Sequence, residues 1–336
     1  MQPLIAVGAE LMRTAAAAVL EVDGARADDA RLIAKLLVDA DLAGHPSHGV
    51  YRVGEYHHGC TSGLVNPRGE PRVINETAPS TMSVDGGGTF GQVAAQFAAG
   101  VVCDRAASQG LSAVALRNCS HVGRLSDHVD AIAERGMIGI ITANDAGANL
   151  IVAPPGALAG RLGTNPFAFA VPRAQRPHLI ADFATSTVAY GAVVVNHRRE
   201  DPTPSNDAKT RAVLEAFGGY KGFALSILVD VLSGILSGAG WSTSREVEES
   251  QGVFMMAIDP DRFCGRSSLV SAVEEMVAWI KSSPTTDGAP VLVPGEVGER
   301  ARRENGDRIE IDQMTWNDLL RVFAETGVTP PPTVPA

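Results

Sequence analysis

"VDGGGTFGQVAAQFAAGVVCDRAA" (residues 84–107) decides the fold, because Gly86, Gly88 and Gly91 match the G-x-G-x-x-G pattern of a dinucleotide-binding turn. A working fingerprint also needs a buried strand before it and an acidic residue about 20 residues later that holds a ribose. Here the preceding run, STMSV, is short and half polar, and the next strand pattern, LSAVALRN, ends in an arginine and an asparagine. We therefore predict a structural turn that leads a strand into a helix, and no Rossmann-type cofactor loop.

Around this turn, short β-like runs alternate with helical patterns, an order that indicates a sheet covered by helices. The predicted strands are LSAVALR, GMIGIITAN, PFAFAVP and HLIADFA, and the predicted helices cover residues 4–22, 28–42, 126–135 and 268–283. The apolar stretch Gly222–Gly238 is interrupted by Asp230 and is short for a membrane span, so we expect a buried core helix. The Pro-rich last residues, 326–336, are expected to fray.

The composition is that of a globular protein and excludes several classes of partner. The 336 residues are 45% hydrophobic and 20% charged, the formal net charge is −10, and the pI is about 5.3. This charge gives no basic footprint for nucleic acid and no lysine-arginine run for an acidic membrane. The four cysteines form no C-x-x-C pair, which favours reduced thiols and a cytoplasmic location over zinc or disulfides.

The densest polar constellation is GHPSHGVYRVGEY, residues 44–56. His48, Arg52 and Tyr56 are four residues apart, so on one helix they share a stripe that can face a cavity, with Ser47 at its start. The arginine fork suits a carboxylate, the histidine can exchange a proton, and the tyrosine can orient a substrate oxygen. The alternative is a capped surface helix with unrelated polar groups. The histidines of this region have no carboxylate or cysteine at a metal-ligand spacing, so no metal site is expected.

Three further polar clusters follow apolar runs. His121 and Arg124 come directly after a predicted strand, where a sheet presents functional loops. Asp182 and the hydroxyl residues after it could bind a ribose or phosphate, or could simply form a capped turn. Lys221 opens the apolar helical stretch, where its charge opposes the helix dipole and indicates an anionic partner.

Seven motifs in order resemble the type-2 malate/L-lactate dehydrogenase family, over roughly residues 5–328. They are GHPSHGVYRVGEY, VDGGGTFGQ, ALRNCSHVGRLSDH, RLGTNPFAFAVP, DFATSTVAYG, GGYKGFALSILVDVLSG and VLVPGE. The family includes ureidoglycolate, sulfolactate and diketogulonate dehydrogenases and the piperideine/pyrroline-2-carboxylate reductases. The resemblance implies an α/β fold of the α+β type, with a non-Rossmann mixed-sheet cofactor domain and a helical domain built from the N- and C-terminal segments. The corresponding division is residues 1–75, 76–240 and 241–336, in a homodimer with its active site between the domains.

The resemblance also implies roles for individual residues. Ser47, His48, Arg52 and Tyr56 match the substrate and proton-transfer motif, and His121 matches the acid/base of the hydroxy-acid members. The imino-acid reductases are instead described with the Ser-His pair and the arginine in proton transfer. Residues in the motifs that contact NAD or NADP are His121, Gly123, Arg124, Asn144, Thr164, Asn165, Asp182, Phe183, Ala184, Lys221, Pro294, Gly295 and Glu296.

The expected function is hydride transfer between NAD or NADP and the α-carbon of a small 2-hydroxy or 2-oxo acid. Two alternatives stay open: a cyclic ketimine reductase on the same scaffold, and a non-catalytic binding homologue. Departures from the family pattern motivate them. The stretch between Gly191 and Gly218 is shorter than usual, Ala192 stands where a lysine is common, and Tyr220 and Asp230 replace a common histidine and glutamate.

Overall fold

The computed structural model describes residues 4–146, 150–188, 213–243 and 250–334 of the 336-residue chain. Its centre is a mixed seven-stranded sheet, in which only the β3–β4 pair is parallel among the described strands. In sheet order the strands are β2 (Arg72–Ala78), β3 (Thr81–Asp85), β4 (Leu111–Cys119), β10 (Ser250–Ile258), β5 (Ile138–Ala146), β7 (Phe167–Val171) and β8 (Leu179–Phe183). The mixed, non-Rossmann α/β fold is thereby confirmed.

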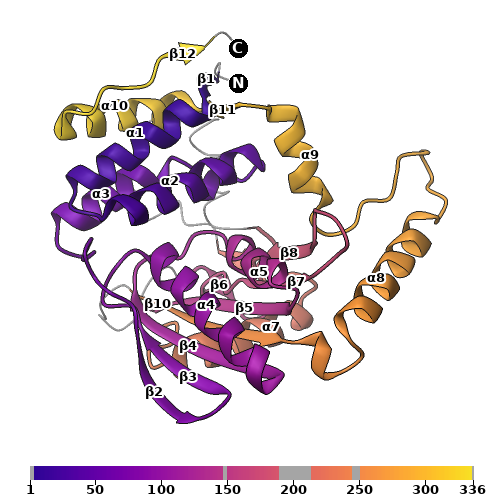
Figure 1. Ribbon diagram of the computed structural model, residues 1–336. Coiled ribbons are helices and arrows are strands. Elements are labelled where there is room, and N and C mark those ends of the chain that lie inside the picture. Colours follow the sequence, from indigo (N-terminus) through magenta and orange to yellow (C-terminus); the bar gives the residue numbers. More distant parts are fainter. Residues whose placement is uncertain (1–3, 147–149, 189–212, 244–249, 335–336) are drawn as a thin grey trace.

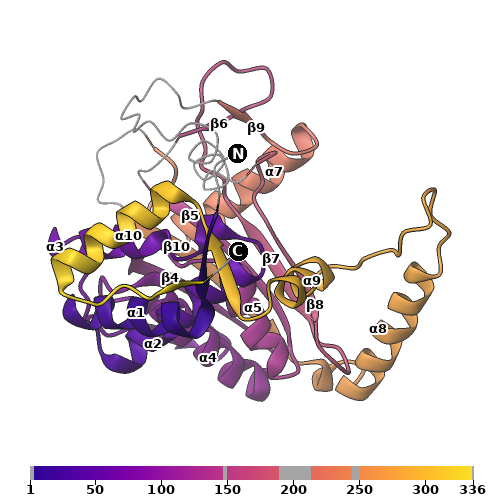
Figure 2. The same cartoon turned by 90° about the horizontal axis from the view of Figure 1, so that it is seen from above.

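Helices cover both faces of this sheet, as Figures 1 and 2 show. One face carries α4 (Gly91–Gln109) and α5 (Leu125–Glu134). The other carries α7 (Tyr220–Val229) and its π-helical continuation η3 (Asp230–Ile235). Alanines line the buried side of α4, so the helix packs closely on β4 in a core shared with α5.

A helical layer lies above both the sheet and α4 in the view of Figure 1, and its helix α2 contacts α4. It consists of α1 (Ala9–Val22), α2 (Ala27–Leu42), η1 (Pro46–His48), α3 (Arg52–Thr61), α9 (Glu296–Asn305) and α10 (Gln313–Thr326). Its hydrophobic core joins N-terminal residues such as Ile33 and Leu37 to Leu319 and Phe323 near the C-terminus. The two ends of the sequence therefore build one layer.

Short elements complete the structure. They are β1 (Ile5–Gly8), β11 (Arg308–Ile311) and β12 (Thr333–Val334) in a three-stranded sheet, β6 (Val152–Ala153) and β9 (Leu214–Glu215) in a pair, and η4 (Pro260–Arg262). Helix α8 (Arg266–Lys281) projects from the body as an arm, joined to α9 by an extended stretch (Figures 1 and 2).

Three local predictions are wrong in an instructive way. Residues 5–8 form strand β1 and not the first turn of a helix, because β11 and β12 supply its hydrogen-bond partners. The Pro-rich end is likewise held at Thr333–Val334 by pairing with β1. The helix predicted to be buried, α7 with η3, instead exposes apolar side chains, for example Leu228 at 50%.

Candidate active site

A cavity of about 450 Å3 lies between α3 and one end of the central sheet. This volume falls in the range of roughly 300–1,000 Å3 typical of small-molecule sites. The polar and titratable residues that line it include His48, Tyr51, Arg52, Glu55, Tyr56, His58, Ser120, His121, Asn144, Asp145, Thr164, Asn165, Ser250 and Gln251. Five separate regions of the sequence thus contribute to one site.

The motif at residues 44–56 reaches the cavity through two elements, not through one helix. His48 ends the 3-10 turn η1, and Arg52 begins α3. The turn between them is held by Asp41, whose Oδ2 accepts from the Val50 backbone N–H at 2.8 Å. The single-helix stripe is therefore wrong for His48, although His48, Arg52 and Tyr56 all line the cavity as expected of a shared face.

His121 meets this group from the loop after β4. Its Nδ1 lies 3.0 Å from Tyr56 Oη, and its ring is 5.6 Å from that of His48. Ser47 is buried beside them, with Oγ 3.1 Å from His48 Nδ1 and its carbonyl accepting from Arg52 Nε at 3.0 Å. The fold thus brings together the five residues that sequence motifs singled out for substrate and proton transfer.

Both histidines are held neutral. Burial, together with the positive charges of Arg52 and Arg124, lowers the pKa of His48 to about 3. Burial and the neighbouring Arg52 and His48 likewise lower the pKa of His121 well below its usual value. An anionic ligand beside Arg52 would reverse the charge part of this effect.

Arg52 keeps its charge and a local counter-ion. Burial alone would lower its pKa, but Glu55, Tyr51 and Tyr56 outweigh burial and raise it. Arg52 Nη1 donates to Glu55, and Tyr51 Oη donates to the other Glu55 oxygen at 2.7 Å. A permanently charged guanidinium in a cavity of this size suits a small carboxylate.

Gln92 belongs to the site and was not singled out from sequence. It is buried, and its Nε2 donates to Tyr56 Oη at 2.5 Å. Gly91 makes this approach possible, because a Cβ there would lie 2.2 Å from the Ser120 carbonyl oxygen and 2.4 Å from the His121 carbonyl carbon. The glycine-rich turn thus presses α4 against the His121 loop, and none of its three motif glycines lines the cavity.

Two buried amide oxygens test whether a nicotinamide group fits. Asn144 Nδ2 is held by Asp230 and the Gly240 carbonyl, and Asn165 Nδ2 by the Ser226 carbonyl, so the orientation of both amides is defined. Their Oδ1 atoms are buried without a hydrogen-bond partner in the described part of the chain. Both oxygens are buried away from the cavity surface, so a ligand in the cavity does not reach them in this arrangement. The support for a nicotinamide is the volume of the cavity and its polar lining by Asn144, Thr164 and Asn165.

Other residues that were expected to contact the cofactor make hydrogen bonds and ion pairs with residues at or near the cavity lining. Thr185, next to Ala184, donates its N–H and hydroxyl to the carbonyl of the lining residue Thr164, at 2.8 and 2.9 Å. Asp182 accepts from the Ser126 N–H at 2.8 Å, and burial raises its pKa. Arg124 is buried and pairs with Asp127 at 2.5 Å.

A last group lies outside the cavity lining. The Phe183 ring packs 5.8 Å from those of Phe167 and Phe217, and Lys221 is exposed in the first turn of α7. The Pro294 carbonyl accepts from the Ile180 N–H on β8 at 3.3 Å, Gly295 follows it in close contact with β8, and Glu296 pairs with Lys281 at 2.6 Å. The shortened segment with Ala192 lies outside the described residues.

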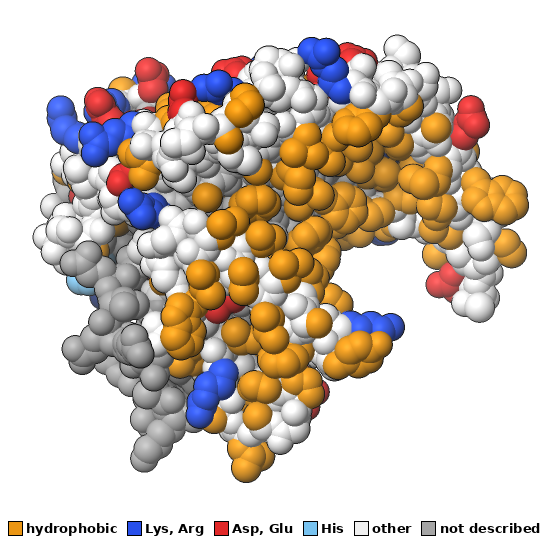
Figure 3. All heavy atoms as spheres, turned by 90° about the horizontal axis from the view of Figure 1, so that it is seen from below, with side chains coloured by type: hydrophobic (Ala, Val, Ile, Leu, Met, Phe, Trp, Pro, Cys, Tyr) orange, Lys and Arg blue, Asp and Glu red, His pale blue; other side chains and the backbone are white. Residues whose placement is uncertain are grey.

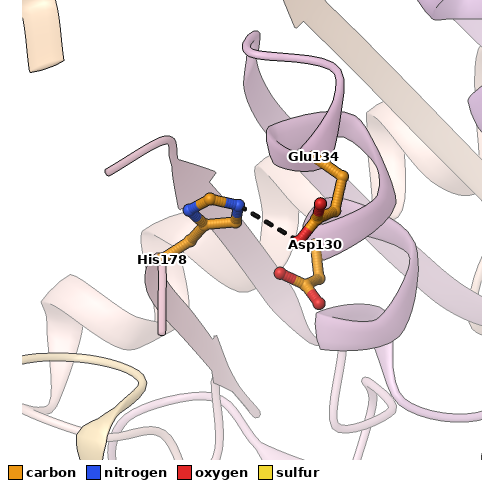
Figure 4. A group of neighbouring side chains, drawn as sticks. All are labelled: Asp130, Glu134 and His178. Atoms are coloured by element: carbon orange, nitrogen blue, oxygen red, sulfur yellow. Dashed lines mark ion pairs between the residues drawn. The ribbon is translucent and has the colours of Figure 1, made fainter. Parts of the chain in front are cut away.

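Among the described residues, the side chains of Asp130, Glu134 and His178 place possible metal-ligand atoms close together (Figure 4). The His178 Nδ1 accepts from the Arg173 backbone N–H at 3.1 Å, so its proton is on Nε2, which faces Glu134 at 3.4 Å. A metal at Nε2 would need the opposite tautomer. Arg176 also pairs with both carboxylates. These contacts favour an ion-pair network at this position over a metal site.

The cavity brings Arg52, His48 and His121 together, an arrangement suited to a small carboxylic acid. The sequence profile of malate/L-lactate dehydrogenase matches residues 7–320, and the chain belongs to this family of oxidoreductases. L-sulfolactate dehydrogenase of Methanocaldococcus jannaschii is 31% identical over 329 residues, covering 92% of this chain and 94% of the relative. Malate dehydrogenase of Pyrococcus abyssi is 36% identical over 306 residues, covering 83% of each chain.

Solved structures agree with this assignment. Malate dehydrogenase from Pyrococcus horikoshii OT3 superposes with a TM-score of 0.87 at 32% identity, covering 97% of both chains. The delta1-piperideine-2-carboxylate reductase from Pseudomonas syringae pvar. tomato superposes with a TM-score of 0.76 at 26% identity, covering 96% of this chain and 99% of the other.

Proposed function

We propose that the protein transfers hydride between a nicotinamide cofactor and the α-carbon of a small 2-hydroxy or 2-oxo acid. The observation that carries the proposal is the placement of His121, neutral and bonded to Tyr56, in the same cavity as Arg52. A carboxylate on Arg52 and a hydroxyl or carbonyl oxygen at His121 would orient the α-carbon between them.

In this proposal, Arg52 and His121 have separate roles. Arg52 binds the substrate carboxylate and fixes its orientation. In the oxidation direction, His121 Nε2 accepts the hydroxyl proton as hydride leaves the carbon; in reduction the same nitrogen returns the proton to the oxygen. We assign this role to His121 rather than His48, because Tyr56 and, through it, Gln92 can adjust the proton at His121 Nδ1, whereas the described partner of His48 Nδ1 is the hydroxyl of Ser47.

NAD or NADP, when bound, supplies the hydride acceptor or donor. We propose that its carboxamide end lies against the part of the cavity lined by Asn144 on β5 and by Thr164 and Asn165 in the loop before β7. The motif residues that lie outside the cavity would then serve the rest of the dinucleotide. We place the reaction in the cytoplasm, whose reducing conditions suit the four free cysteines.

A cyclic ketimine reductase is the second candidate. Its support is the relative named for delta1-piperideine-2-carboxylate, and the acidic side chains of Glu55 and Asp145 at the cavity, which suit a cationic iminium carbon. The non-catalytic reading predicts binding without turnover.

A second copy of the chain is the partner that we propose for the exposed apolar face. Figure 3 shows hydrophobic side chains gathered across this face, and exposed apolar residues lie on both α7–η3 and the arm α8. They include Ile227, Leu228, Val231, Ile235, Leu236, Met276, Trp279 and Ile280. Contiguous apolar patches of this kind mark interaction sites, and a projecting apolar arm is suited to embracing a partner.

The test is a titration of the protein with NADH and NADPH, followed by fluorescence, and then by absorbance after adding oxaloacetate, pyruvate or piperideine-2-carboxylate. Turnover with an oxo acid supports the first candidate, and turnover confined to the cyclic imine replaces it with the second. Cofactor binding without turnover on any of these acids would support a binding homologue instead.

A further inference from the structure

The side chains of Gln92, Tyr56 and His121 form a chain of hydrogen bonds that ends in an unused acceptor. Gln92 Nε2 donates to Tyr56 Oη at 2.5 Å, and Tyr56 Oη lies 3.0 Å from His121 Nδ1. Gln92 Oε1 is buried and has no partner within the described residues. Buried amide oxygens rarely stay unpaired, which indicates a second state of the network in which this oxygen is used.

We propose that Gln92 is a positioning residue whose amide rotates by half a turn as His121 changes its protonation state, and so controls whether His121 Nε2 can accept a proton from the substrate or only donate one. The proposal rests on the acid/base role of His121 proposed above. Gln92 acts only through Tyr56 and is absent from the cavity lining.

The observed orientation fixes the resting tautomer. Gln92 Nε2 can only donate, so the Tyr56 oxygen accepts from it and directs its own proton to His121 Nδ1. The proton of neutral His121 then lies on Nε2, the nitrogen left for the cavity. In this state His121 can donate a hydrogen bond to a bound oxygen but cannot accept its proton.

The states in which His121 transfers a proton need the opposite orientation of the Gln92 amide. Uptake of one proton from solvent by the resting ring gives an imidazolium that is protonated at both nitrogens. Its Nδ1 then donates to Tyr56 Oη, and the tyrosine proton must find another acceptor. Burial raises the pKa of Tyr56, so the tyrosine keeps this proton. A half-turn of the Gln92 amide brings Oε1 to Tyr56 and supplies the acceptor. With Nδ1 protonated throughout, Nε2 alone gives its proton to the substrate oxygen or takes it back, and no other proton moves.

The charges around His121 do not determine which of its two ring nitrogens is protonated. The groups facing His121 are His48 from η1 and Arg52 from α3, and both disfavour its charged form. The carboxylate of Glu55 accepts hydrogen bonds from Arg52 and Tyr51. Gly123 leaves the space for the amide, because a Cβ there would come within 3.3 Å of Gln92 Cγ.

The test is nitrogen-15 NMR of the histidine rings in the full-length protein without ligands, with His121→Gln used to assign the signals. We expect the Nε2–H tautomer in the native protein. Gln92→Glu, an acceptor only, should convert His121 to an Nδ1-protonated form and raise its apparent pKa by at least about one pH unit, a tenfold change in proton affinity. Gln92→Met, which is uncharged and similar in size, should leave His121 as a mixture of tautomers.

Gln96→Glu places the same charge one turn further along α4 and serves as the control; it should leave the His121 signals unchanged. Tyr56→Phe should abolish the effect of Gln92→Glu, since it removes the connecting hydroxyl. A native Nδ1–H tautomer, or identical His121 signals in both Gln92 variants and the native protein, overturns the proposal. These spectra need no turnover, so a protein inactive toward every acid refutes the proposed function separately.

Discussion

Arg52 is the residue on which we expect substrate binding to depend most. Its Nε and Nη1 are engaged by Ser47 and Glu55, which hold the guanidinium plane in place for an incoming carboxylate. Arg52→Gln should raise KM for the acid about 10–100-fold, the range for a charged hydrogen bond of roughly 1.5–3 kcal/mol. Arg52→Lys keeps the positive charge but loses the planar fork of the guanidinium, so its KM should lie between those of the native protein and Arg52→Gln.

Steady-state kinetics with saturating cofactor would measure this effect, and Arg31→Gln on the exposed face of α2 is the matched control. A KM unchanged in Arg52→Gln would remove Arg52 from carboxylate binding.

His48 makes a second prediction, on stability. Its pKa is lowered from 6.5 to about 3 in the folded protein, so between these values the unfolded chain binds a proton that the folded chain does not. The free energy of unfolding therefore falls as the pH falls through this window. His48→Gln removes this contribution, and its loss of Tm between pH 7.5 and 5 should be smaller than that of the native protein by about 2–4 °C.

Thermal unfolding followed by circular dichroism measures this difference, with His58→Gln, an exposed histidine of α3, as the control. An equal loss of Tm in the His48 variant and the native protein would mean that His48 is protonated alike in the folded and unfolded chains.

At the scale of elements, the start of α4 is the critical contact between the glycine-rich turn and the His121 loop. Gly91→Ala would place a Cβ 2.2 Å from the Ser120 carbonyl oxygen, so the loop must move. We expect a loss of about 1–3 kcal/mol in stability, typical of overpacking, together with a larger loss of kcat.

Gly100→Ala lies on the same helix with nothing within 4 Å of the new Cβ, and should stabilise the protein by up to about 1 kcal/mol. Urea unfolding of both variants gives the comparison. Equal stability for the two would show that the Gly91 contact can relax freely.

Some elements could be predicted from the sequence and others could not, depending on whether the interactions that form them are local. The helix predicted at residues 28–42 was found at Ala27–Leu42, because its apolar spacing is local. Strand β1 was missed because its partners lie about 300 residues away in the sequence. Strand β10, at the centre of the sheet, was also missed, because its sequence shows no strong alternation of polar and apolar residues. Gln92 carries no sequence signal of its own, since its role arises only where α4 meets α3 and the His121 loop. The division at residues 75 and 240 stays a prediction.

The exposed apolar face governs behaviour at the scale of the whole molecule. A pattern of apolar residues predicts burial, but it does not say whether the covering surface lies in the same chain. Trp279 on the arm is 79% exposed and Leu236 beyond α7 is 59% exposed, although both belong to sequences that look like core. A second copy that covers both elements would account for this pattern.

We expect Trp279→Glu and Leu236→Glu each to shift the protein from dimer to monomer, because a charge in an apolar interface is costly. Sedimentation equilibrium over a range of protein concentrations would measure the shift. Arg300→Glu on the exposed surface of α9 is the control and should leave the association state unchanged. A monomeric native protein at all concentrations would show that this face is covered by something other than a second copy. If the dimer forms, loss of turnover in the two charged variants with intact α-helical circular dichroism would further indicate that the arm of one copy supports the active site of the other.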